Sequence, residues 1–99
     1  DSVLDNLLGN ALRKRREDKS VGISVRLECT EQTTLSVCDT GVAAPEAVAA
    51  HLFDAPVGSE HGLGIGLYQA GKQAAQLGYK LRLASNRDGE VCFTLSNQL

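Results

Sequence analysis

The sequence predicts a two-layer α/β fold, in which helices pack on one face of a single β-sheet. Two observations lead to this prediction. Four segments alternate apolar and polar residues, so each strand would have one apolar face. The first segment of the chain has the apolar periodicity of an amphipathic helix, and a second helix is predicted after the glycine stretch. A chain of 99 residues suits one domain with one modest core, so we expect residues 1–99 to form a single domain.

Residues 1–18 form the first predicted helix. Three polar residues, Asn6, Asn10 and Arg13, gather at one edge of its apolar half. The apolar half itself carries Val3, Leu4, Leu7, Leu8, Ala11 and Leu12. We therefore expect this helix to pack on the sheet, with the three polar side chains at the boundary with water.

Two strands follow this helix. Residues 33–39 turn Leu35 and Val37 inward, and the same parity turns Asp39 inward. Residues 21–29 predict a half-buried strand with an inward face of Val21, Ile23, Val25, Leu27 and Cys29. The opposite face of the sheet should be wetter and should carry Arg26, Glu28, Cys38, Lys80, Arg82, Cys92 and Thr94.

The second half of the chain predicts two helices and a hairpin. Pro45 suits the first position of a short helix over residues 45–53, and a loop follows it. The remaining elements are a glycine stretch at 62–66, a helix at 67–77 that Gly78 ends, and strands at 79–85 and 90–96 joined by the turn at 86–89.

Composition excludes several classes of function. The net charge of −2 gives no basic field for nucleic acid or an acidic membrane, and no apolar run approaches the ~20 residues of a membrane span. The three cysteines, Cys29, Cys38 and Cys92, show no metal-binding spacing, so we expect small, partly buried thiols in a reducing cytoplasm rather than disulfides or zinc ligands. Because the chain opens inside a predicted helix, we expect it to be an excised fragment of a longer protein.

The glycine stretch is the first candidate functional segment. Glycines directly before a helix let the backbone approach a ligand closely, and the unpaired amides of the first helical turn suit phosphate. The spacing of Gly62, Gly64 and Gly66 matches neither a dinucleotide fingerprint nor a P-loop. The alternative is a turn that only connects two elements.

Asp39 is the second candidate. A carboxylate that points inward beside Val37 needs a donor, and the exocyclic amine of adenine is one, whereas guanine presents a carbonyl oxygen there. The following Thr40-Gly41 lets the chain turn sharply and approach a base. The alternative is an aspartate that ends a strand in an Asx-turn.

Asn6, Asn10 and Arg13 are the third candidate set. Their spacing stacks them on one helix edge, where amide oxygens suit Mg²⁺ and Arg13 could bind a phosphate. The alternative is a polar helix rim. The basic run over residues 13–16 is interpreted as favourable charge at a helix C-terminus rather than as a nucleic-acid site.

Three segments in order, NLLGNALRK, DTGVAAP and GLGIGL, resemble the N, G1 and G2 boxes of sensor histidine kinases. The stretch LFDAPVGSEH resembles a shortened F box and ATP lid. The resemblance covers essentially the whole chain. It implies the Bergerat-type ATP-binding fold shared by gyrase, heat-shock chaperones, histidine kinases and MutL, with one mixed β-sheet and helices on one face.

The resemblance also implies roles for individual residues. Asn10 would hold Mg²⁺, Asn6 would lie beside the phosphates and Arg13 would bind a phosphate. Lys14 stands where the family often has an aromatic residue or histidine that touches the nucleotide. The remaining ATP-binding residues would be Asp39 on the adenine amine, Gly41 under the base, and the lid hinge and phosphate loop of Gly62, Leu63, Gly64, Gly66 and Leu67.

The implied function is that of an ATP-binding catalytic domain of a two-component sensor histidine kinase. It would present the γ-phosphate of ATP to a histidine on a missing dimerisation domain, and a response regulator would act downstream. Gyrase-like ATPases have a glutamate where this chain has Asn6, which favours phosphotransfer over hydrolysis. By the same resemblance the general base belongs to the missing helix, so no residue of this chain is expected to be catalytic. His51 and His61 are interpreted as lid or surface residues.

The sequence leaves two alternative functions open. One is a serine kinase of the anti-sigma type with the same fold, against which Asn6 argues. The other is an interaction module that has kept the fold and lost ATP, and Ala43 supports it, because the family has a glycine there. The isolated chain is expected to be cytoplasmic and inactive in autophosphorylation.

Overall fold

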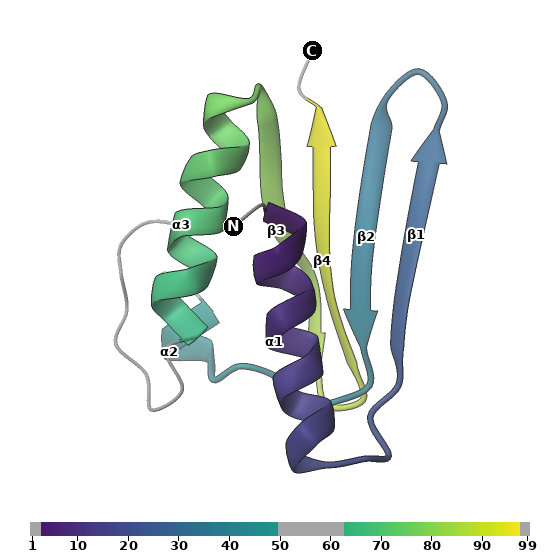
Figure 1. Cartoon of the computed structure of the whole chain (residues 1–99), viewed down its shortest axis with the longest axis vertical. Coiled ribbons are helices and arrows are strands. Elements are labelled where there is room, and N and C mark those ends of the chain that lie inside the picture. Colours follow the sequence, from purple (N-terminus) through teal and green to yellow (C-terminus); the bar gives the residue numbers. More distant parts are fainter. Residues whose placement is uncertain (1–2, 50–62, 98–99) are drawn as a thin grey trace.

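The computed structural model describes residues 3–49 and 63–97 (Figure 1). The elements follow in the predicted order: α1 Val3–Glu17, β1 Ile23–Cys29, β2 Thr33–Asp39, α2 Glu46–Ala49, α3 Leu63–Gln76, β3 Tyr79–Arg87 and β4 Glu90–Asn97. The expectations for the lid, including Gly62, Phe53, His51 and His61, lie outside the described residues.

The two-layer fold is confirmed. Four strands form one sheet in the order β1-β2-β4-β3, and α1 and α3 pack side by side on one face of it (Figure 1). The sheet was expected to be mixed, but every neighbouring pair of the described strands is antiparallel. The physical reason is that β4 inserts between β2 and β3. The crossover through the helices joins two parallel strands that do not touch, so no parallel pair forms.

The core lies between the two helices and the central strands. Leu7 of α1 and Leu67 of α3 are each 1% exposed, and they pack with Val37, Val91 and Phe93 of the sheet. The small residues Ala70 and Ala74 let α3 approach closely. The apolar half predicted for α1 is confirmed at Val3, Leu7 and Ala11, while Leu12 is 48% exposed.

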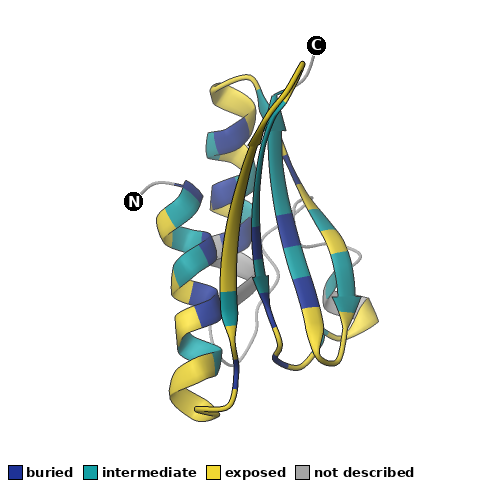
Figure 2. Cartoon of the chain, turned by 90° about the vertical axis from the view of Figure 1, so that its right-hand side faces the viewer, coloured by how far each residue is buried: buried dark blue, intermediate teal, exposed yellow. Residues whose placement is uncertain are grey.

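The prediction that β1 is half-buried is wrong. Val25 and Leu27 are 51% and 62% exposed, and Figure 2 shows most of this strand coloured as exposed. The physical reason is the strand order, because α1 packs on β2 and α3 packs on β3, which leaves the edge strand β1 beyond both helices. Only Val21, which precedes the strand, is buried as expected.

Glycines end α3 and turn the last hairpin as predicted. Gly78 has a φ of 80° and its amide donates to Ala75 O, so it closes the last turn in the left-handed conformation. Gly89 has a φ of 89° in the turn between β3 and β4. Among residues 3–49 and 63–97, no helix is long and apolar enough to span a membrane.

The start of α3 differs from the prediction. The helix begins at Leu63 rather than near Leu67, so Gly64 and Gly66 belong to its first turn instead of to a loop. Glycine lowers helix propensity but does not forbid the first turn, where packing of the rest of the helix against the core stabilises it. The first-turn amides, which lack intrahelical partners, therefore come from the glycine stretch itself.

The expectation of three reduced thiols is wrong for two of them. Cys38 and Cys92 face each other directly across β2 and β4 and form a disulfide. Spacing could not indicate this bond, since the two residues are 54 positions apart and only the strand register brings them together. Both lie on the wetter face of the sheet, as predicted, and Cys29 is an exposed free thiol.

Reduction of this disulfide should lower the free energy of unfolding by roughly 2–4 kcal/mol, because it restores freedom to the unfolded chain between two distant residues. Urea unfolding with and without a phosphine reductant measures the change. The double variant Cys38→Ala/Cys92→Ala should be indifferent to the reductant, and Cys29→Ala should respond as the unchanged chain does. Equal unfolding curves with and without reductant would contradict the bond.

Candidate functional site

A cavity of about 200 Å³ lies between the last turns of α1 and the segment that follows β2. Leu67 of α3 and Val91 and Phe93 of β4 give it an apolar floor. The described residues that line it are Asn10, Arg13, Lys14, Glu17, Val42, Ala43, Ala44, Pro45, Leu67, Val91 and Phe93. Apolar walls with a few polar groups at one rim are typical of a small-molecule site.

Asp39 ends β2 with its side chain turned inward, as predicted, and is only 4% exposed. Its Oδ1 accepts a hydrogen bond of 2.9 Å from the amide of Gly41, which is the local geometry of an Asx-turn. The Asx-turn, which the sequence allows as the alternative to a base-binding role, is therefore present. It leaves the rest of the carboxylate in need of further donors.

Lys14 supplies these donors in the chain as it stands. Its ammonium lies 3.2 Å from Asp39 Oδ1 and 3.3 Å from Asp39 Oδ2, and it donates to the carbonyl oxygen of Val42 at 3.1 Å. The pair is well covered, with side chains that are 12% and 3% exposed. The resemblance places Lys14 at the nucleotide, but no pattern in the sequence indicates that it pairs with Asp39.

Gly41 is a position where a side chain would be crowded by Lys14 and Asp39 as they lie in this structure. A Cβ there would lie 2.9 Å from Cδ of Lys14 and 3.0 Å from Oδ1 of Asp39. The stem of Lys14 thus covers Gly41, where the resemblance places the base. Ala43, by contrast, adopts no left-handed conformation and packs its methyl group against the core, so alanine is compatible with the backbone there.

Asn10 and Arg13 lie together on α1, as their spacing predicts. Asn10 is 9% exposed and lines the cavity, and its Oδ1 accepts a hydrogen bond of 3.0 Å from Nη2 of Arg13. Arg13 is also 3.8 Å from Glu17. Asn6 lies one turn earlier on α1, is partly buried and does not line this cavity.

Two further residues shape the site and were not predicted. Asn86 accepts from the amide of Ala44 and donates to its carbonyl oxygen, both at 2.9 Å, and Asp88 accepts from the amide of Ala43 at 2.9 Å. These bonds fasten the segment after β2 to the β3–β4 hairpin. In the sequence, Asn86 and Asp88 indicate only a hairpin turn. Their bonds to Ala43 and Ala44 could not be predicted, because that segment lies more than 40 residues away in the sequence.

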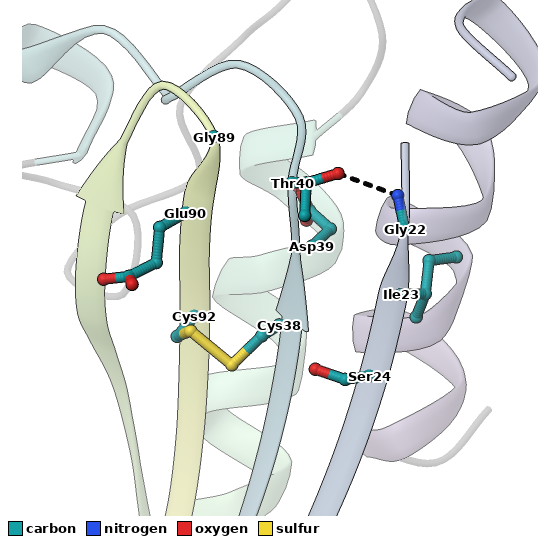
Figure 3. A pocket seen from close by; sticks show the side chains of 9 residues that line it. All are labelled: Gly22, Ile23, Ser24, Cys38, Asp39, Thr40, Gly89, Glu90 and Cys92. Carbon is teal, nitrogen blue, oxygen red and sulfur yellow. Dashed lines mark hydrogen bonds between the residues drawn. A yellow bond between two sulfur atoms is a disulfide. The ribbon is translucent and has the colours of Figure 1, made fainter. Parts of the chain in front are cut away.

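A second hollow lies at the ends of β1, β2 and β4 and is shown in Figure 3. The Cys38–Cys92 disulfide lines it, and so do Thr40 and Gly22, where the hydroxyl of Thr40 accepts a hydrogen bond of 2.8 Å from the amide of Gly22. The charged residues that line it, Asp39 and Glu90, are both acidic. An anionic ligand therefore fits the cavity beside α1 better than this hollow.

The polar side chains that line the cavity suit a nucleotide better than a permanently bound metal ion. Within the described part of the chain, no group of three or more His, Cys, Asp or Glu side chains could hold a metal ion. A neutral amide such as that of Asn10 can complete the shell of Mg²⁺ only when a ligand's phosphate oxygens and water supply the rest. By this chemistry, Asn10 can serve a metal ion only when a polyphosphate is bound with the ion.

Comparison with solved structures shows the same fold in histidine kinases. Full-length ShkA in complex with AMPPNP superimposes with a TM-score of 0.77 at 23% identity, over 96% of this chain and 20% of that chain. Two nucleotide-free forms of the catalytic domain of ThkA give TM-scores of 0.77 and 0.73 at 24% and 26% identity, over 96% of this chain and 62% of theirs. The chain thus spans about three fifths of the ThkA domain and one fifth of ShkA.

No curated protein matches the sequence. The family model of the histidine kinase-, DNA gyrase B- and HSP90-like ATPases, however, matches residues 1–99, which is the whole chain. Together with the fold and the order of the three boxes, this match identifies the chain as a member of the histidine kinase-, DNA gyrase B- and HSP90-like ATPase family.

Proposed function

We propose that this chain is the ATP-binding catalytic domain of a two-component sensor histidine kinase, which presents the γ-phosphate of ATP to a histidine on a dimerisation domain outside this chain. The observation that carries the proposal is the buried carboxylate of Asp39 beside Gly41, next to a cavity that Asn10 and Arg13 line. AMPPNP, an ATP analogue, is the ligand of the full-length ShkA structure.

The proposed roles divide between the two ends of the cavity. At one end Asp39, which lies next to the cavity through its bond with Lys14, accepts the exocyclic amine of adenine. Val91, Phe93 and Leu67 of the cavity lining provide an apolar surface for the ring. At the other end Arg13 neutralises phosphate charge, and the first-turn amides of α3 donate to phosphate oxygens. Catalysis by such a domain consists mainly of positioning and charge neutralisation.

Asn10 is the residue that would hold Mg²⁺. The ion would supply charge neutralisation of the phosphates during transfer. In this structure the Asn10 oxygen accepts from Arg13, so Arg13 would turn toward the phosphates when Asn10 turns to the ion. Both side chains line one cavity, which makes the exchange a local one.

Asn6 favours a kinase over a hydrolase within this proposal, because an amide cannot act as the general base for water. The acceptor histidine and the response regulator belong to the parent protein, and a cytoplasmic location follows from that role. A nucleotide-free interaction module remains the second candidate. The observation that favours it is the Lys14–Asp39 pair, which satisfies the base-binding carboxylate without any ligand.

Isothermal titration tests the proposal. Mg-ATP should bind with a dissociation constant between tens of micromolar and millimolar, roughly −6 to −4 kcal/mol. GTP should bind at least about tenfold more weakly, because the carbonyl oxygen of guanine meets the Asp39 carboxylate and cannot donate to it.

The matched control is ADP with and without Mg²⁺, which keeps the base and changes only the phosphates. Equal affinities for ATP and GTP would sink the assignment of adenine to Asp39. A folded chain that binds neither nucleotide would favour the interaction module instead.

A further inference from the structure

The Lys14 side chain occupies space that the proposed nucleotide would need. A third hollow, of about 270 Å³ and distinct from the one in Figure 3, adjoins the cavity of about 200 Å³ beside α1. Lys14, Glu17 and Val42 line both this third hollow and the cavity. Each is smaller than the roughly 300–1,000 Å³ of typical ligand pockets, whereas the two joined would reach that range. The Lys14 side chain therefore lies at the boundary between the two hollows.

The ammonium of Lys14 is also fully engaged. It has three protons and meets three acceptor oxygens, two on Asp39 and one on Val42, at 3.1–3.3 Å. Asp39 is absent from the described lining of the cavity beside α1, and Lys14 is present in it. A ligand in that cavity thus meets Lys14 before it meets the carboxylate.

The stem of Lys14 occupies the surface next to Gly41. Its Cδ and Cβ lie 2.9 and 3.7 Å from the point where a Gly41 side chain would begin. A planar base that lies against Gly41 and donates to Asp39 therefore needs the space of both the stem and the ammonium. Base binding and the observed position of Lys14 exclude each other.

We infer that Lys14 sets the affinity and base selectivity of the site by holding, in the nucleotide-free chain, the place on Asp39 that the amine of adenine takes. The inference rests on the proposed function. A nucleotide whose base donates to Asp39 binds only the state in which Lys14 has left Asp39, so its apparent affinity falls by the fraction of chains in that state. Only a base with a donor opposite Asp39 compensates the carboxylate for the lost ammonium.

The first test uses the unchanged chain. A ¹H–¹⁵N spectrum of lysine ammonium groups should show one signal protected from water, assigned to Lys14 by its absence in Lys14→Met. Saturating Mg-ATP should remove that protection. The triphosphate of purine riboside, which lacks the exocyclic amine, should remove it far less at the same concentration. Protection that persists in the ATP-saturated chain would overturn the inference.

The second test compares affinities by titration. Lys14→Met should bind Mg-ATP roughly tenfold or more tightly than the unchanged chain. Its affinity for the purine riboside triphosphate should change less, so the ratio between the two nucleotides widens. Lys14→Gln, which keeps a neutral donor, should lie between the two, and the exposed Lys80→Met serves as the control that changes neither affinity.

The outcomes separate the inference from the proposed function. If both Lys14 variants bind Mg-ATP as the unchanged chain does, or more weakly, Lys14 is no competitor and the inference fails while ATP binding stands. If the unchanged chain and both variants are folded and none binds either nucleotide, the proposed function fails and the inference fails with it. Binding that appears only in the variants would support the inference most directly.

Discussion

Leu7→Ala should lower the free energy of unfolding by about 2–5 kcal/mol. Leu7 is 1% exposed and is among the largest fully buried side chains of the described chain, at the centre of the face that α1 packs on the sheet. Removing its three terminal carbons loses their transfer free energy and leaves a cavity between two layers that cannot close on it. Against the roughly 5–15 kcal/mol of a typical domain, this change alone brings the chain close to unfolding.

Urea unfolding followed by circular dichroism measures this difference, with the disulfide kept oxidised in both samples. Leu12→Ala is the matched control, since it is the same substitution on the same helix at a side chain that is 48% exposed. It should change stability by no more than about 0.5 kcal/mol. Equal effects at the two positions would mean that α1 does not pack on the sheet as described.

The elements and their order could be predicted because their signals are local. The period of apolar residues distinguishes helix from strand, Gly78 marks the end of α3, and the turn before Gly89 marks the last hairpin. The position of a strand within the sheet, by contrast, is not indicated by local sequence. The exposure of Val25 and Leu27 depends on β1 being an edge strand, and nothing in its own alternation distinguishes an edge strand from a central one.

Long-range pairings could not be predicted from the sequence for the same reason. The disulfide between Cys38 and Cys92 follows from the register of β2 on β4, which a single sequence does not reveal. The bonds from Asn86 and Asp88 to the segment after β2 need the hairpin to fold back beside it. In each case the sequence shows the residue type but does not show which residue it contacts.

The candidate site was partly predictable. The ordered boxes imply that Asn10, Arg13 and Asp39 belong to one nucleotide site, and the structure brings these three side chains into the same region of the fold. What the boxes could not indicate is that the polar groups satisfy one another. Asn10 pairs with Arg13, and Asp39 pairs with Lys14, because buried polar groups without a ligand take the nearest donors.

Asp39→Ala should lower the free energy of unfolding by about 3–5 kcal/mol and abolish measurable ATP binding. The substitution leaves the Lys14 ammonium, on a side chain that is 12% exposed, without its carboxylate. It also leaves the buried amide of Gly41 without the acceptor it meets at 2.9 Å. Urea unfolding and titration with Mg-ATP measure the two effects on the same sample.

The double variant Lys14→Met/Asp39→Ala separates the two roles of this carboxylate. Replacing both partners removes the unpaired charge, so the double variant should be more stable than Asp39→Ala alone, although Gly41 still lacks its acceptor. ATP binding should not return with the stability, because the acceptor for the adenine amine is still missing. If the double variant regained ATP affinity together with stability, Asp39 would serve the fold alone, and the base would be recognised by other groups of the cavity.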